Sequence, residues 1–156
     1  MRLIGLFILL AITTASFLWE QNVLAGTRWH CKTIKTDFLS ESFQPYQSLY
    51  ERMSITFQSD QTFSIREFVT ITGKDGRKGT MENLYSGYYG LDGNNMSMSI
   101  LDVRTATLFH DPIINQEYSS YKGVTIDYTI AMNEQSLYLF NKHRSEIFNS
   151  ACFKVQ

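Results

Sequence analysis

The sequence predicts an all-β protein, an eight-stranded antiparallel up-and-down meander that closes into a barrel. Three observations support this. Apolar residues recur with a period of two, the strand period, through most of the chain. Short turns rich in Gly, Asp and Asn join nearly all of these segments. Two cysteines bracket the folded part, Cys31 near its start and Cys152 near the C-terminus.

The N-terminus resembles an export signal. Arg2 precedes an apolar run over 3–12, and small residues follow over 13–16. The alternative is an uncleaved membrane anchor, because the run reaches 17 residues when it is extended to Trp19. Either reading takes the protein out of the cytoplasm, into the periplasm or the medium.

The cleavage site has two candidate positions, after Ala15 or Ser16, and after Ala25. We expect a signal peptide, or an anchor, over 1–25. Residues 26–156 then form a single domain, which is long enough to bury its own core.

The first three expected strands cover 27–36, 51–58 and 62–72. The second and third show clean alternation, and the polar turn 59–61 joins them as a hairpin. The next turn, 74–79, combines glycines with charged residues and leads into the fourth strand.

The fourth and fifth strands, 80–91 and 95–103, are joined by the tight turn 92–94. In the fifth strand the alternation breaks at Ile100 and Leu101. This break predicts a β-bulge there.

The last three strands follow a long irregular stretch over 104–123. The sixth, 124–132, has the most regular alternation in the chain, and short turns or loops lead on to 136–141 and 147–155. First and last strands of a closed meander are neighbours.

That neighbourhood gives the two cysteines a structural role. A disulfide between Cys31 and Cys152 would join the first strand to the last across the seam of the barrel. The alternative, two free thiols, does not suit an oxidising compartment.

Composition excludes several classes of function. Lys and Arg (14) nearly balance Asp and Glu (15) and are scattered, so a nucleic-acid partner is not expected. The chain has no metal-ligand spacing and no nucleophile, phosphate-loop or dinucleotide motif. We therefore expect no cofactor, no metal and no enzymatic activity, and membrane contact only through an uncleaved N-terminal segment.

The opening of the domain resembles the lipocalin-like (calycin-type) family of small barrels. Gly26 and Trp29 resemble the Gly-x-Trp motif of the first lipocalin strand, with one additional residue between them. The resemblance implies that Trp29 plugs the barrel base and that a basic residue near the last strand, Arg144 or Lys154, packs on it.

A second resemblance is to bacterial lipocalin-like domains. It lies in the strand–turn–strand 55–63 followed by the Gly-x-Tyr strand and turn over 86–94. The implied fold is a cup with an apolar interior, in which the first connection, 37–50, forms a lid over the mouth.

Candidate ligand-binding residues are those expected on the inner wall or the lid. Glu67 shares the parity of the apolar residues around it; either it anchors a ligand's polar group, or a bulge or a wet rim position turns it to solvent. The tyrosines line a cavity or serve as ordinary core. The full set is Glu67, Tyr85, Tyr88, Tyr89, Tyr128, Phe43 and Tyr46.

Candidate partner-binding residues lie in the irregular stretch, which is apolar for a loop. It forms either a binding surface or a flap folded over the barrel end. The candidates are Phe109, His110, Ile113, Tyr118 and Tyr121.

Two functions follow from these expectations. The first is an extracytoplasmic, non-enzymatic binding protein that holds a small apolar or amphipathic ligand in the barrel. The alternative is a protein-binding module, of the periplasmic inhibitor or immunity type, acting through the loops 37–50 and 105–123.

Overall fold

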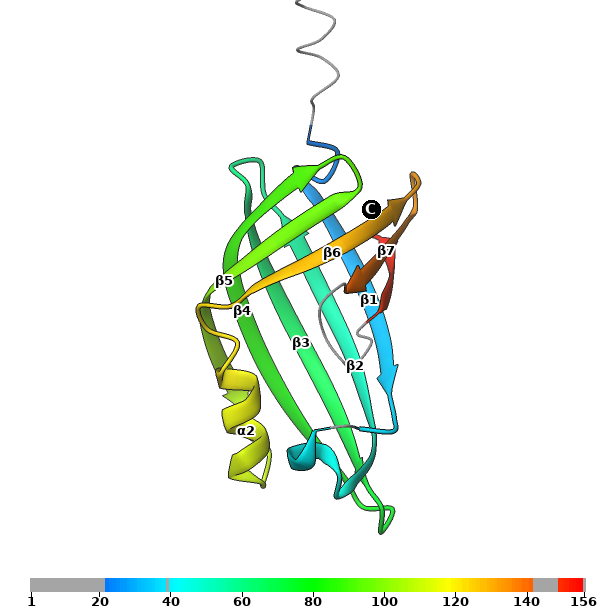
Figure 1. Ribbon diagram of the computed structural model, residues 1–156, viewed down its shortest axis with the longest axis vertical. Coiled ribbons are helices and arrows are strands. Elements are labelled where there is room, and N and C mark those ends of the chain that lie inside the picture. The colour runs from blue at the N-terminus through cyan, green and yellow to red at the C-terminus, as the bar shows by residue number, and fades with distance from the viewer. Residues whose placement is uncertain (1–21, 39, 142–148, 156) are drawn as a thin grey trace, which may run out of the picture.

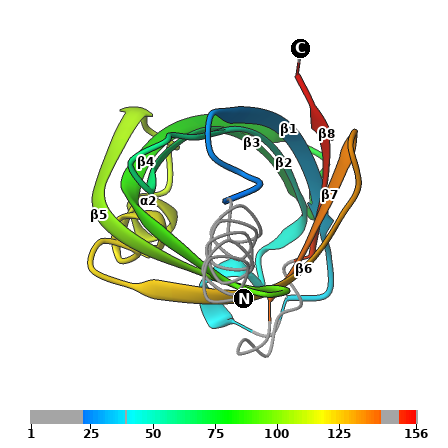
Figure 2. The ribbon, with the colours of Figure 1, turned by 90° about the horizontal axis from the view of Figure 1, so that it is seen from above.

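The chain folds into a closed barrel of eight antiparallel strands, in which each strand pairs with the next and the last pairs with the first (Figures 1 and 2). The computed structural model describes residues 22–38, 40–141 and 149–155. The predicted meander and its closure are confirmed. The strands are β1 (Thr27–Lys35), β2 (Tyr46–Phe57), β3 (Thr62–Gly73), β4 (Lys78–Asp92), β5 (Asn95–Thr107), β6 (Thr125–Met132), β7 (Ser136–Asn141) and β8 (Ser150–Lys154).

Two expected loops are shorter than the sequence indicated, and each contains a short helix. β2 begins at Tyr46, so the connection after β1 does not reach residue 50, and it contains the 3-10 helix η1 (Glu41–Phe43). The stretch after β5 contains the helix α2 (Pro112–Ser119), which the strand-period analysis did not predict. Residues 147 and 148, expected in the last strand, lie outside the described residues.

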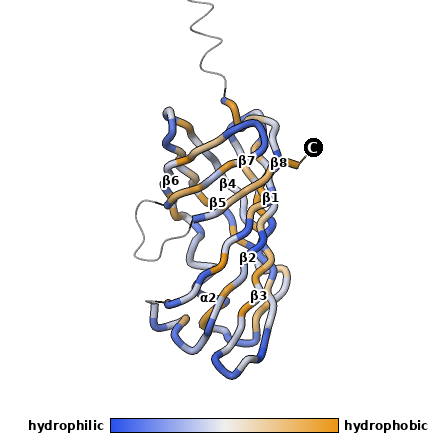
Figure 3. Tube along the Cα trace, turned by 90° about the vertical axis from the view of Figure 1, so that its right-hand side faces the viewer, coloured by the Kyte–Doolittle hydropathy of each residue, from blue (hydrophilic) through white to orange (hydrophobic). Residues whose placement is uncertain are grey.

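The strands alternate between buried and exposed positions, and Figure 3 shows the matching alternation of hydropathy. The predicted bulge in β5 is confirmed. Ser86 pairs with Asp102 while Gly87 pairs with Ile100, which leaves Leu101 as the extra residue. Gly87 is required there, since a Cβ at this position would lie 1.9 Å from the carbonyl oxygen of Ser99.

The end of the barrel at which β1 begins is filled by buried side chains. Leu24 and Phe57 are fully buried there, and Trp29 is 1% exposed. The Lys154 ammonium lies 5.9 Å from the ring centroid of Trp29, as the family resemblance implied for one of two basic residues. Figure 2 shows the turn before β1 crossing this end.

The opposite end is covered by α2 and η1 (Figure 1). Asp111 caps α2 by accepting a hydrogen bond from the Ile113 amide, and proline begins the helix. Ile114 and Tyr118, one turn apart, form its buried face. The Tyr46 hydroxyl donates to Asp111 at 2.7 Å and so attaches the helix start to β2.

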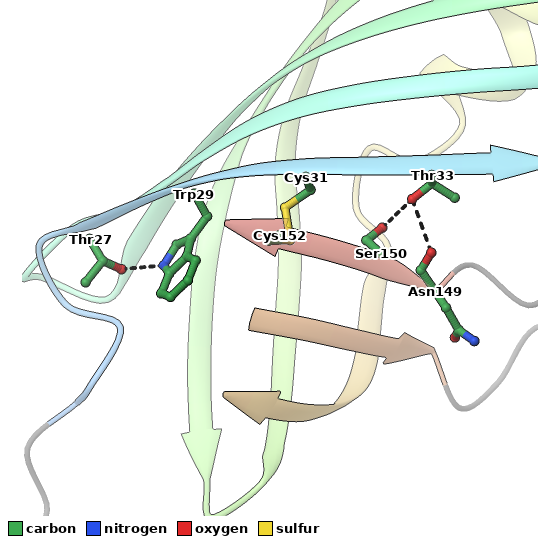
Figure 4. Close-up of a disulfide and its surroundings, with 7 residues drawn as sticks. All are labelled: Thr27, Trp29, Cys31, Thr33, Asn149, Ser150 and Cys152. Carbon is green, nitrogen blue, oxygen red and sulfur yellow. Dashed lines mark hydrogen bonds between the residues drawn. A yellow bond between two sulfur atoms is a disulfide. The ribbon is translucent and has the colours of Figure 1, made fainter. Parts of the chain in front are cut away.

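The seam between β1 and β8 is short and is held by the predicted disulfide. Only four residue pairs join these two strands among the described residues, and one of them is Cys31 opposite Cys152. The Cα atoms of the two cysteines lie 3.9 Å apart, and both side chains are buried. Beside the bond, the hydroxyls of Thr33 and Ser150 lie 2.7 Å apart (Figure 4). The seam is therefore covalent and hydrogen-bonded on the inner wall.

We expect the double substitution Cys31→Ala, Cys152→Ala to lower the free energy of unfolding by about 2–5 kcal/mol, because the bond closes a loop of 121 residues. Urea denaturation monitored by circular dichroism measures this. Wild type reduced with a thiol is the control and should match the variant. A loss below about 0.5 kcal/mol, the usual size of a surface effect, would show that the bond does not hold the seam.

Candidate functional site

A cluster of polar side chains lies on the inner wall of the barrel, on neighbouring strands. Glu51 on β2 and Glu67 on β3 are 3% and 5% exposed, and Asn83 on β4 is fully buried. Regular register brings them together. Glu67 pairs directly with Asn83 on β4. On β2 it pairs with Met53, so Glu51, two residues away on the same face, lies diagonally across from it. No register shift separates Arg66 from Phe68, so no bulge turns Glu67 outward.

Glu51 has a charged partner. The Lys35 ammonium lies 2.6 Å from its Oε1, at the end of β1. The Tyr118 hydroxyl, from α2, donates to the same oxygen at 3.0 Å. Glu51 therefore forms an ion pair reinforced by a neutral donor.

Glu67 is held by neutral donors. The Tyr85 hydroxyl donates to its Oε2 at 2.6 Å, and the Asn83 amide donates to the same oxygen at 3.3 Å. Thr105 in turn donates to the Asn83 carbonyl oxygen at 3.0 Å, which fixes the amide orientation. Among the described residues no Lys, Arg or His lies within ion-pair distance of Glu67.

This environment changes the acidity of the cluster. Burial, and then the negative charge of Glu51, raise the pKa of Glu67 to about 7. Burial, followed by the charge of Glu67, raises the pKa of Tyr85 well above its usual value. Burial and the charge of Glu51 do the same to the pKa of Tyr118. At neutral pH both tyrosines are therefore protonated donors, whereas Glu67 is populated in both its protonated and its ionised form.

A cavity of about 100 Å³ borders this cluster. Lys35, Glu51 and Glu67 line one part of it. Asn141 on β7 and Ser150 on β8 also line it. The remaining wall is apolar or aromatic, and its side chains come from β2 to β6, from α2 and from the turn after it. They are Met53, Ile65, Ile100, Ile126, Tyr85, Tyr118, Tyr121 and Tyr128.

Three of the predicted ligand-binding residues line this cavity: Glu67, Tyr85 and Tyr128. Tyr89 is buried elsewhere, in the filled end, where its ring lies 4.8 Å from that of Phe57. Tyr88 is 54% exposed, and the expectation that it lines the interior is wrong. Adjacent strand residues point to opposite faces, so Tyr88 and Tyr89 cannot both face inward.

The two residues predicted on the lid lie at the α2 end, outside the cavity wall. Phe43 packs edge-on against Tyr118, with ring centroids 6.4 Å apart. Tyr46 packs against Phe109 at 5.8 Å and binds Asp111. Both therefore support the helix that carries Tyr118 into the cavity.

The predicted partner-binding stretch does not present an aromatic patch. Phe109 and Tyr118 are each 5% exposed, and Tyr121 lines the cavity. Of the five candidates, Ile113 is 56% exposed, and His110 also faces solvent. The stretch therefore folds back over the barrel end, which was the alternative for this segment.

Sequence reasoning missed Glu51, Lys35 and the role of Tyr118 in this cluster. Glu51 shares the parity of Met53, Ile55 and Phe57, and that signal would have placed it inside. Lys35 ends its strand and has no such signal.

Other classes of site find no support within the described residues. They contain no group of three or more His, Cys, Asp or Glu side chains able to hold a metal ion. None of their helices is long and apolar enough to span a membrane. Comparison of the sequence with protein-family models and with curated proteins gives no match.

We expect Glu67→Gln to stabilise the protein at high pH and to leave it unchanged at low pH. The raised pKa means that the folded state binds more protons than the unfolded state between about pH 4.5 and 7, so wild-type stability falls as pH rises through this window. Glutamine imitates the protonated acid and removes this cost, which is roughly 3 kcal/mol above pH 7.

Urea unfolding of both proteins from pH 4.5 to 8.5 measures the effect. Glu134→Gln, at an exposed turn, is the matched control and should follow wild type throughout. Parallel curves for wild type and Glu67→Gln would contradict the raised pKa.

Proposed function

We propose that this protein is a non-enzymatic binding protein that holds a small amphipathic molecule in the cavity beside Glu67. The observation that carries the proposal is the conjunction of a cavity with a buried carboxylate on its wall. A carboxylate in the interior destabilises a fold, whereas apolar side chains of similar volume would not. Buried ionisable groups with perturbed pKa values are concentrated at functional sites.

The size of the cavity limits the ligand. The cavity volume is about 100 Å³, and an apolar cavity of about 150 Å³ accommodates benzene. The proposed ligand, or the part of it inside the barrel, therefore has about four to six non-hydrogen atoms. Its apolar portion would contact Ile65, Ile100 and Ile126, and its polar end would face Glu67.

The architecture supports a lipocalin-like assignment, which we propose on three features. The barrel is an eight-stranded meander, Trp29 lies in its filled end, and Lys154 packs on that tryptophan. Ligand binding inside a barrel closed at one end is the function that this resemblance implies.

We also propose that the protein is exported, with cleavage ahead of residue 22. The disulfide is of the kind that persists in oxidising compartments. Leu24 is fully buried in the barrel end, and the Asn22 amide donates to the Tyr89 hydroxyl at 2.8 Å. Cleavage after Ala25 would remove both, so cleavage after Ala15 or Ser16 fits the folded domain better.

Expression of the full chain in a Gram-negative host tests this proposal. We expect the periplasmic fraction to contain a protein whose N-terminus is Ser16 or Phe17, as measured by intact mass. A chain starting at Gly26 should unfold at lower urea concentration, because burial of a leucine contributes about 2–5 kcal/mol. A native N-terminus at Gly26, with undiminished stability, would overturn the assignment.

The ligand proposal predicts saturable binding of small probes in the cavity. The probes share a four-carbon chain and differ in the polar end: 1-butanol, butylammonium and butyrate. Titrations followed by amide chemical shifts should map at least one of them to Glu67 and Tyr85. Ile126→Phe, which fills the cavity, should weaken binding by about tenfold or more, equivalent to 1.4 kcal/mol.

Ile34→Phe provides the control, since it makes the same substitution at a position that is 72% exposed. It should leave binding unchanged. If none of the three probes binds saturably, or if both variants behave alike, the proposed function is wrong.

A further inference from the structure

We infer that the ligand is a small organic cation, an alkylammonium group whose nitrogen is bound by Glu67. This inference rests on the proposed function and specifies the charge of the ligand. It follows from which hydrogen-bonding atoms the cavity wall leaves open, from its charge, and from its aromatic content.

The first argument concerns the second oxygen of Glu67. Both hydrogen bonds to this carboxylate end on Oε2, so Oε1 has no donor among the described residues. No fully buried side-chain nitrogen or oxygen of the described residues lacks a hydrogen bond. Oε1 therefore borders open space, and Glu67 lines the cavity. A ligand in the cavity meets an acceptor that is available for a donor.

Two hydroxyls of the wall point to the same chemistry. Tyr85 donates a hydrogen bond to Glu67, and Tyr118 donates one to Glu51. Each hydroxyl oxygen then has only acceptor capacity left for a ligand. An ammonium group has donors and no acceptor, so it matches these atoms, whereas a carboxylate has only acceptors and does not.

The charges of the wall favour a cation as well. Lys35 and Glu51 form an ion pair and largely cancel one another. The charged groups and tyrosines facing Glu67 from the surrounding elements are Glu51 on β2, Lys35 on β1, Tyr85 on β4, Tyr118 on α2, Tyr121 after α2, and Tyr128 on β6. When Glu67 is ionised, these described residues together carry one net negative charge.

Aromatic rings complete the site. Four tyrosines line the cavity, and the rings of Tyr118 and Tyr121 lie 6.4 Å apart. Ring faces attract ammonium groups, most strongly in sites withdrawn from water. Ile65, Ile100 and Ile126, which also line the cavity, suit a short alkyl chain.

Direct comparison of the three probes at pH 8 tests the inference. We expect butylammonium to bind at least tenfold more tightly than 1-butanol, and butyrate to bind more weakly than either. In Glu67→Gln the advantage of butylammonium over 1-butanol should fall below about threefold, while 1-butanol still binds and so reports an intact cavity. Glu134→Gln should retain the full advantage.

The pH dependence provides a second readout. Lowering the pH from 8 to 5.5 protonates Glu67, so butylammonium affinity should fall by about tenfold or more, because each pH unit below the pKa reduces the ionised fraction about tenfold. The affinity of 1-butanol should not change over this range. Glu67→Gln should remove the pH dependence.

The outcomes separate the inference from the function on which it rests. If 1-butanol or butyrate binds as tightly as butylammonium, the cavity binds ligands but does not select a cation, and the inference is overturned while the proposed function stands. If no probe binds, both are overturned. A butylammonium advantage that survives Glu67→Gln would also contradict the role of this carboxylate.

Discussion

The closure of the barrel between β1 and β8 is the constraint on which the other features depend. β8 has five residues, and four residue pairs join it to β1. The Cys31–Cys152 bond lies in this short seam, so the covalent link reinforces a ladder of only four described residue pairs. If the seam opened, Ser150 would separate from Thr33, and Lys35 would separate from the cavity wall formed by β7 and β8. The interior would then become accessible to water, and the buried polar cluster would lose its low-dielectric environment.

Within the closed barrel, strand periodicity decides what that interior contains. Side chains at alternate positions face inward, and most of these are apolar, but Glu51, Glu67 and Asn83 fall on the same face. Each has hydrogen-bonding partners on neighbouring strands or on α2. These partners offset the desolvation cost of burying the cluster, but they do not make it a net source of stability. The two ends of the barrel are closed differently, and the cavity lies between them. Leu24, Trp29 and Phe57 fill one end, whereas α2 covers the other with one tyrosine pointing inward.

Much of this was predictable from local patterns. The hairpins, the bulge at Leu101, the pairing of the cysteines and the inward direction of Glu67 all follow from period-two alternation and turn chemistry. The errors have equally local causes. Residue type alone groups Tyr88 with Tyr85 and Tyr89, whereas strand parity places it on the outer face. α2 spans only eight residues, so its helical period rests on the single pair Ile114 and Tyr118 and is easily missed. The stronger signal of this helix is at its start, where Asp111 precedes a proline.

By itself, the sequence determined the strand period, the order of the strands and the seam that the cysteines mark, because each depends on residues close in sequence or on one unique pair. Only the tertiary structure decided the composition of the candidate site. The Glu51–Lys35 ion pair, the donation from Tyr118 and the cavity beside Glu67 join residues from β1, β2, β3 and α2. Such contacts depend on barrel diameter, register and the folding back of α2, and these are set by packing over the whole chain.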